Sequence, residues 1–161
     1  MKHLVIISGG QTGVDRAALD VALKLKIACS GWCPRGRWAE DGPLEERYPL
    51  KETRSADPKE RTEKNILESD GTLVLTGLYG ADRGTETTEY LARIYDKPLI
   101  SVPLAENEKK QILVVRNWMQ MHQISRLNVA GPRESHEAGM YEMATRFLHG
   151  LIKSIPGRSD S

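Results

Sequence analysis

The sequence predicts an α/β fold of three layers, in which a doubly wound parallel sheet of about five strands lies between two layers of helices. Two observations lead to this prediction. Short apolar runs alternate along the chain with longer segments whose apolar residues recur at helical spacing. The chain has 161 residues, enough for one hydrophobic core but not for two. We therefore expect a single domain.

The first predicted elements are a strand and a helix. Residues 3–8 form an apolar run that ends at Gly9 and Gly10, which is typical of a strand buried on both faces and followed by a sharp turn. From Val14 to Leu25, apolar residues recur at the spacing of an amphipathic helix. A strand followed by such a helix is the repeating unit of a parallel α/β sheet.

A weaker strand and a long loop come next. Residues 28–33 predict the second strand, and residues 34–57 are polar and contain several Gly and Pro, which predicts a loop. Loops of this length are usually functional or mobile. Asp57, Pro58 and Glu60 then form a capping-box arrangement, which predicts a helix over residues 58–69.

The remaining elements continue the alternation. The last helix begins near Met140, and its stripe of Met and other apolar residues is typical of a core face. Residues 156–161 are expected to form a frayed tail. We expect the strand order 2-1-3-4-5 of flavodoxin-like sheets, with the first strand central. The other predicted strands cover residues 71–76, 99–102 and 127–130, and the other predicted helices cover residues 85–96 and 107–122.

Charge and hydropathy limit the classes of partner. Lys and Arg number 23 against 22 Asp and Glu, a net charge of +1, whereas a nucleic-acid partner would require a basic excess. The longest aliphatic runs, residues 4–7 and 112–115, are far shorter than the roughly 18 residues of a membrane span. The N-terminus shows no signal-peptide pattern. We therefore expect a cytoplasmic protein with neither a nucleic-acid nor a membrane partner.

The cysteines and histidines do not predict a metal site. Cys29 and Cys33 are expected to be reduced thiols on one strand, because their spacing matches neither a redox motif nor half of a zinc motif. None of the four histidines lies at metal-ligand spacing from another.

Three Gly-containing loops are the strongest candidates for a binding site. They cover residues 8–13, 80–85 and 131–135, each between a predicted strand and a helix, so we expect them at one edge of the sheet. Glycines let the backbone approach an anion, and helix N-termini offer N–H groups and partial positive charge. The loops therefore predict a phosphate site. Its backbone candidates are Gly9, Gly10, Gln11, Thr12, Gly13, Gly84, Thr85 and Gly131.

The first loop differs from the common nucleotide-binding motifs. It has neither the spacing and Lys of a P-loop nor the pattern GxGxxG, which disfavours ATP hydrolysis and ordinary NAD binding. We expect Gly10 to lie outside the core, so a side chain there should block the ligand with little loss of stability.

Charged and hydroxyl side chains flank these loops. Asp15 and Arg16 lie in the first turn of a helix, where an Arg is unfavourable unless an anion is nearby. Arg133 can bind a phosphate through parallel hydrogen bonds, and the hydroxyls of Thr88 and Ser135 can donate hydrogen bonds to it. Structural roles remain open: a helix-end role for Asp15 and Arg16, capping for Thr85, Thr88 and Ser135, and a surface salt bridge for Arg133.

The start of the long loop offers candidate lid contacts, namely Arg35, Gly36, Trp38, Glu40 and Asp41. Trp38 can stack on a planar ring, although it can equally anchor the loop to the core. Glu40 and Asp41 can bind a hydroxyl, an amino group or Mg²⁺, and a solvated acidic turn is the alternative.

Residues 7–19, ISGGQTGVDRAAL, resemble the putative molybdenum carrier family, which is grouped with circularly permuted relatives of YpsA in the SLOG superfamily. Further similar segments, in the same order, are GWCPRGRWAEDGPLEERYPL at 31–50, ERTEKNILESDGTLVL at 60–75, GTETT at 84–88 and LNVAGPRES at 127–135. The resemblance implies a Rossmann-like, SLOG-type ligand-binding domain over residues 1–155. It also implies a phosphorylated nucleotide-like or pterin ligand, and the family name implies molybdenum cofactor, a pterin monophosphate that carries molybdenum on a dithiolene.

The chain departs from the enzymes of this superfamily at one motif. Those that cleave cytokinin riboside monophosphates carry PGGxGTxxE with a catalytic Glu. In that register Thr88 takes the acid position here, Arg83 replaces a Gly, and Glu89 lies one residue late. The resemblance therefore implies a phosphate site but assigns no catalytic residue.

Three functions stay open on this reading. The leading hypothesis is a binding or carrier protein, with the Gly-containing loops on the phosphate of a small molecule and residues 35–42 over its ring. The alternative is a hydrolase of a nucleotide-derived substrate, with Glu40, Asp41 or Glu89 as its acid–base group. In the third, the loops are only tight turns of a structural subunit. We also expect a homo-oligomer.

Overall fold

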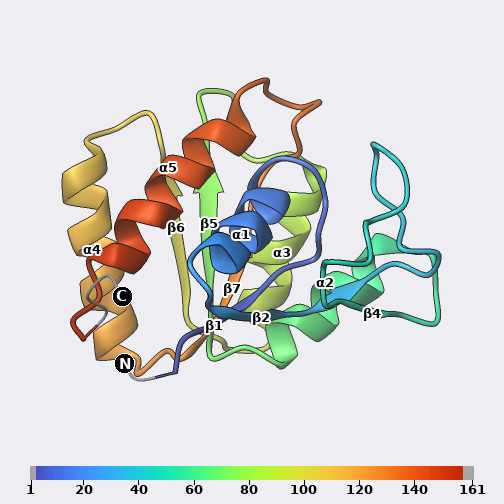
Figure 1. Cartoon of the computed structure of the whole chain (residues 1–161), viewed down its shortest axis with the longest axis horizontal. Coiled ribbons are helices and arrows are strands. Elements are labelled where there is room, and N and C mark those ends of the chain that lie inside the picture. Colours follow the sequence, from blue (N-terminus) through green and yellow to red (C-terminus); the bar gives the residue numbers. More distant parts are fainter. Residues whose placement is uncertain (1–2, 158–161) are drawn as a thin grey trace.

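The computed structural model describes residues 3–157, and residues 158–161 of the expected tail lie outside this part of the chain. Its main sheet is parallel and has five strands in the order β2-β1-β7-β5-β6 (Figure 1). The predicted α/β fold is confirmed, with strands near the predicted positions. They are β1 (Val5–Ile7), β2 (Ala28–Ser30), β5 (Gly71–Thr76), β6 (Leu99–Pro103) and β7 (Arg126–Ala130).

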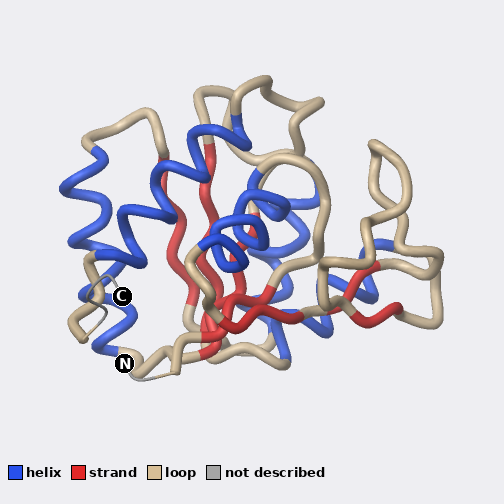
Figure 2. The backbone as a smooth tube through the Cα atoms, in the orientation of Figure 1, coloured by secondary structure: helices blue, strands red, loops and turns tan. Residues whose placement is uncertain are grey.

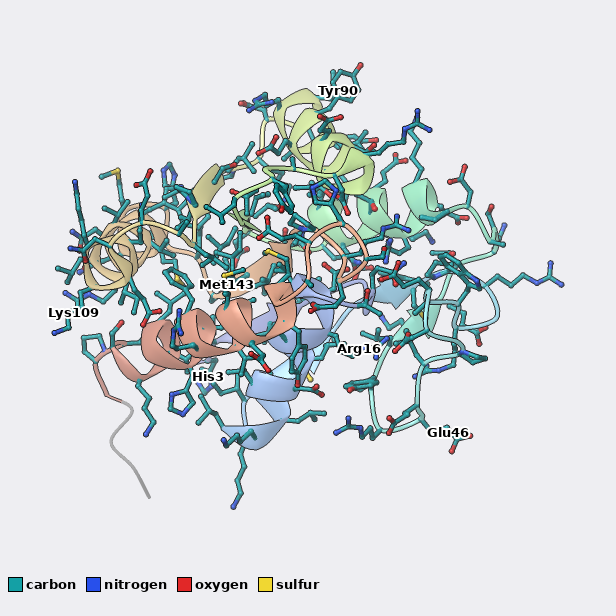
Figure 3. All side chains as sticks on the ribbon, turned by 90° about the horizontal axis from the view of Figure 1, so that it is seen from above. His3, Arg16, Glu46, Tyr90, Lys109 and Met143 are labelled. Atoms are coloured by element: carbon teal, nitrogen blue, oxygen red, sulfur yellow. The ribbon has the colours of Figure 1, made fainter. Side chains whose placement is uncertain are left out.

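Helices cover both faces of this sheet. Helices α1, α4 and α5 pack together on one face and α2 and α3 on the other, as the view from above, down the strands, shows (Figure 3). The larger core lies beneath the first group, where Met140 is buried and Met143 packs against the core, so the methionine stripe faces the interior as predicted. The helices are α1 (Val14–Lys24), α2 (Pro58–Leu67), α3 (Arg83–Ile94), α4 (Glu108–Met121) and α5 (Met140–Lys153).

The strand order differs from the expected one. Counted along the chain within this sheet, it is 2-1-5-3-4, because β7 is inserted between β1 and β5. Leu127 on β7 pairs in register with Ile6 on β1 and with Gly71 on β5. Apolar patterns identify strands but do not fix their neighbours, since a parallel crossover can skip a position. As a result, the loop after β7 lies between the loops after β1 and β5, at the topological switch point.

The predicted second strand is divided in two at Gly31. Gly31 has φ +143°, and a Cβ atom there would overlap the carbonyl oxygen of Ser8. The chain leaves the main sheet at this point, and β3 (Trp32–Cys33) pairs instead with β4 (Lys51–Glu52). The two cysteines are free thiols, but they lie on two strands rather than on one.

Residues 31–57 form a compact projection that we call the side lobe, on the right of Figure 2. It is mostly loop, as predicted, but it has its own apolar cluster, in which Leu44 and Leu50 pack near Leu19 of α1. The guanidinium of Arg37 donates hydrogen bonds of 2.7–3.1 Å to four backbone carbonyls of the lobe. These contacts explain how a segment with little regular structure holds its shape.

No helix within residues 3–157 is both long enough and apolar enough to cross a membrane.

Candidate functional site

A small cavity of about 40 Å³ lies where β1, β5 and β7 end, and we call it the strand-end pocket. All three Gly-containing loops contribute to it, through Gly9, Gly84 and Gly131 among others. Two glycines allow the three loops to lie in close contact with their neighbours. A Cβ atom at Gly13 would overlap the carbonyl oxygen of Pro132, and one at Gly131 would overlap that of Leu75. The expectation that the loops share one edge of the sheet is confirmed.

Arg61 of α2 is the cation that reaches deepest into this pocket. Its side chain is 12% exposed, and its Nη1 donates to the carbonyl oxygen of Gly9 at 3.0 Å. A Cβ atom at Gly9 would overlap this guanidinium, so a side chain there would displace Arg61 from its present position. Nη1 also lies 3.8 Å from Oδ2 of Asp15. Within residues 3–157, no group accepts a hydrogen bond from Nη2 of Arg61.

Arg133 supplies a second cation from the loop after β7. Its guanidinium lies 3.6 Å from Asp82 and 3.9 Å from Glu40, distances that are too long for hydrogen bonds. Asp82 instead accepts hydrogen bonds from the backbone N–H groups of Thr85 at 2.8 Å and Arg133 at 3.1 Å, which caps α3 and fixes the loop. The guanidinium of Arg133 is therefore available to an anion.

Asp15 is a buried carboxyl whose pKa lies above its usual range. Burial raises its pKa to about 6, an effect that Arg61 and a hydrogen bond from the Gln11 N–H partly offset. Because the unfolded state releases this proton more readily, folding becomes less favourable as the pH rises from about 3.8 to about 6. Asp82 differs: burial opposes its ionisation, but hydrogen bonds from Thr85 and Arg133 hold its pKa below the usual value.

A second, wider cavity of about 660 Å³ lies between α1, the side lobe and the start of α5, and we call it the side groove. Arg16 forms a bidentate ion pair with Asp41 there, at 3.0 Å for both bonds, and donates to the carbonyl oxygen of Gly10 at 3.1 Å. Figure 3 shows Arg16 between α1 and the side lobe. Asp20 accepts hydrogen bonds of 2.6 Å from the hydroxyls of Tyr48 and Tyr141. Burial and Asp20 raise the pKa of Tyr141 to about 12.

Glu40 lines the side groove and contacts residues that line the strand-end pocket. Its carboxylate accepts hydrogen bonds from the hydroxyl of Thr12, from the hydroxyl of Ser135 at 2.6 Å and from the Ser135 N–H at 3.2 Å. Its own N–H donates to the side chain of Gln11 at 2.9 Å. Burial raises the pKa of Glu40, but the hydrogen bonds from Ser135 and Thr12 outweigh this and lower it below the usual value. Glu40 therefore ties the side lobe to the Gly-containing loops.

The structure divides the predicted site residues into three groups. Gly9, Gln11, Asp15, Gly84, Thr85, Thr88, Gly131 and Arg133 line the strand-end pocket. Thr12, Gly13, Arg16, Glu40, Asp41 and Ser135 line the side groove. Gly10, Arg35, Gly36 and Trp38 line neither cavity.

Two expectations about this region are wrong. Gly10 is buried, and a Cβ atom there would lie 2.8 Å from the side chains of both Leu44 and Leu50, so this position belongs to a core. Ser135 does not cap α5, because Glu134 accepts hydrogen bonds from the N–H groups of Gly139 at 2.6 Å and Tyr141 at 2.9 Å.

The sequence analysis did not single out Arg61, nor the other polar pocket residues Thr62, Asn65, Asp82 and Asn128. Arg61 lies in the first turn of α2, where the helix dipole disfavours an Arg unless an anion or carboxylate is near. The same argument led to Arg16, so the signal was present in the sequence.

The acids considered for hydrolysis lie apart from the strand-end pocket. Glu89 is half-buried in α3, accepts a hydrogen bond from the Ser101 hydroxyl at 2.6 Å and lines neither cavity. Glu40 and Asp41 line the side groove. Thr88, at the position of the superfamily's catalytic acid, faces the pocket and donates to the carbonyl oxygen of Gly84 at 3.0 Å. Within residues 3–157, no cluster of His, Cys, Asp or Glu could hold a metal ion.

A parallel sheet with a pocket at its strand ends defines a ligand-binding protein of the Rossmann-like class. The sequence comparison agrees and is more specific. The profile of the Circularly permutated YpsA SLOG family matches residues 6–152, and the chain belongs to this family.

A solved structure is also similar. It is the crystal structure, at 1.45 Å resolution, of a protein from Syntrophus aciditrophicus SB named "Putative molybdenum carrier protein". It shares 40% sequence identity with this chain, with a TM-score of 0.90, and the alignment covers 93% of this chain and 95% of that one. No curated protein showed a significant match.

Proposed function

We propose that this protein binds the phosphate end of a phosphorylated, nucleotide-like or pterin ligand in the strand-end pocket and acts as its carrier. The proposal rests on one observation: three strand-to-helix loops and two arginines, Arg61 and Arg133, line the same pocket. Helix α1 starts beside this pocket without a side-chain cap, so its N-terminal N–H groups add positive potential.

Molybdenum cofactor is a ligand of this kind and is supported by the name of the similar protein. Its phosphate would interact with Arg61 and Arg133, and its molybdenum would be held by its own dithiolene. Such a ligand requires no metal site made of protein side chains. The ring would face the side groove, where Glu40 and Asp41 lie.

A hydrolase would need an acid–base group beside the phosphate. Asp15 fits this role better than the acids considered from the sequence, because it lines the pocket and its pKa lies above the usual range. Chromatography of mixtures of the protein with GMP distinguishes the two functions: a carrier returns GMP unchanged, whereas a hydrolase releases guanine, guanosine or phosphate.

The two arginines predicted from helix starts are expected to differ. Arg133→Ala should weaken GMP binding about tenfold, because one charge-assisted hydrogen bond to the phosphate is lost. Guanosine binding should stay unchanged, because guanosine has no phosphate. Arg16→Ala should change GMP binding much less, because Arg16 is already paired with Asp41 in the side groove. Isothermal titration of both variants measures the difference. If Arg16→Ala weakens GMP binding more than Arg133→Ala does, the phosphate binds in the side groove instead.

Anion binding should strengthen as the pH falls. Sulfate keeps both charges between about pH 7.5 and pH 5.5, whereas Asp15 becomes protonated in this range and no longer repels it. Linkage allows a gain of up to about 25-fold, the ratio of the protonated fractions of Asp15 at the two pH values. Titration with sulfate at both pH values measures the gain, and Asp15→Asn should abolish the pH dependence. An equal pH dependence in this variant would mean that another group titrates.

The homo-oligomer expected from the sequence stays a prediction, which sedimentation velocity of the purified protein tests.

A further inference from the structure

The carboxylate of Glu40 occupies a cradle of hydrogen-bond donors. The hydroxyls of Thr12 and Ser135 and the N–H of Ser135 all donate to it. Arg133 lies 3.9 Å away and adds positive charge. Three donors and a guanidinium around one pair of oxygens are also what a phosphoryl group requires.

The donors and the carboxylate come from different parts of the chain. Thr12 belongs to the loop after β1, and Ser135 and Arg133 belong to the loop after β7, so the cradle is built on the rigid edge of the sheet. Glu40 comes from the side lobe, which contacts the sheet edge here through Gln11 and Ser135 and contacts α1 through the Arg16–Asp41 pair. Its side chain is 20% exposed, so it can leave the cradle for solvent without crossing a packed core.

The cradle adjoins the strand-end pocket. Arg133 connects them, because its Nε lies 3.6 Å from Asp82 on the pocket side while its Nη1 lies 3.9 Å from Glu40 on the cradle side. Gln11 lines the pocket, and Thr12, the next residue, donates to the cradle. A ligand whose first phosphoryl group occupies the pocket would therefore meet the cradle next.

We propose that Thr12, Ser135 and Arg133 form a second oxyanion site, which takes the second phosphoryl group of a diphosphate-containing ligand, and that Glu40 fills this site in the absence of such a ligand. The inference rests on the proposed function, since the first phosphoryl group must bind in the strand-end pocket. Displacement of Glu40 would also widen the side groove toward Gln11 and Arg133, which line the strand-end pocket.

The test compares inorganic phosphate with pyrophosphate by isothermal titration. Glu40→Ala empties the cradle, so pyrophosphate no longer competes with the Glu40 carboxylate for the donors. Pyrophosphate binding should therefore tighten about tenfold, which corresponds to the gain of one charge-assisted hydrogen bond. Phosphate binding should change less than about threefold, since it uses the pocket and a partly exposed charge is screened. Glu52→Ala is the matched control. Glu52 anchors the same lobe through the Gly36 N–H at 2.7 Å but lies outside both cavities, so neither affinity should change.

Two more variants complete the test. Glu40→Gln keeps the size of the side chain and replaces the carboxylate with a weaker acceptor, so it should give a smaller gain in pyrophosphate affinity. This variant keeps the test valid if the alanine variant folds poorly. Adding Ser135→Ala to Glu40→Ala should cancel the gain for pyrophosphate. The inference is overturned if Glu40→Ala and Glu40→Gln leave pyrophosphate binding unchanged or weaker, or if Glu52→Ala gives the same gain. The proposed function fails separately, if phosphate does not bind the unaltered protein at all.

Discussion

Arg61→Met is expected to weaken GMP binding about a hundredfold and to leave guanosine binding unchanged. The guanidinium is mostly buried and lies against the Gly9 backbone, so solvent screens its bond to phosphate less than at an exposed site. Isothermal titration with both probes measures the effect. Arg93→Met is the matched control, because Arg93 is exposed in the last turn of α3, far from the strand ends.

The same substitution should also change the titration of Asp15. Arg61 is the strongest influence that lowers the pKa of this buried carboxyl, so its loss should move that pKa above about 6. NMR titration of the Asp15 carboxyl carbon observes the shift. If the variant shows the raised pKa but binds GMP as well as the unaltered protein does, the phosphate does not interact with Arg61.

Gly10→Val is expected to lower the free energy of unfolding by about 3 kcal/mol. Gly10 has φ +77°, a conformation that costs a residue with a side chain about 1–2 kcal/mol. A Cβ atom there would lie 2.8 Å from the side chains of Leu44 and Leu50, and overpacking costs about 1–3 kcal/mol more. Urea unfolding at constant pH measures the loss.

Gly36→Val separates the two causes of that loss. Gly36 has φ +83°, close to that of Gly10, but a Cβ atom there would have no neighbouring atom within 4 Å, so only the backbone strain applies. The Gly36 variant should therefore lose about 1–3 kcal/mol less than the Gly10 variant. Equal losses would mean that the contacts of Gly10 with the leucines relax at no cost.

The layers and elements of this fold could be predicted because burial leaves a periodic pattern in the sequence. The stripe from Val14 to Leu25 and the cap at Asp57 each predicted a helix, and the structure confirms both, with Asp57 accepting from the Lys59 N–H at 2.9 Å. The insertion of β7 between β1 and β5 could not be predicted, because β5 and β7 are both buried apolar strands and such runs do not encode which strand pairs with which.

The site was predictable only as far as its loops. Glycines before helices indicated an anion site, and the structure brings these loops together. Contacts between distant segments leave no such pattern: the cradle around Glu40 joins residues 95 positions apart in the sequence, and Arg61 contacts Gly9 across 52 positions. The close contact of Gly10 with the side lobe is of the same kind, which is why its burial was not foreseen.

The position of a bound oxyanion tests the central claim most directly. A crystal soaked in selenate, a tetrahedral dianion whose selenium is located by anomalous scattering, is expected to show its main peak in the strand-end pocket, within hydrogen-bond distance of Arg61 and Arg133. A main peak in the side groove, beside Arg16 and Arg47, or no ordered selenate in the strand-end pocket, would contradict the account.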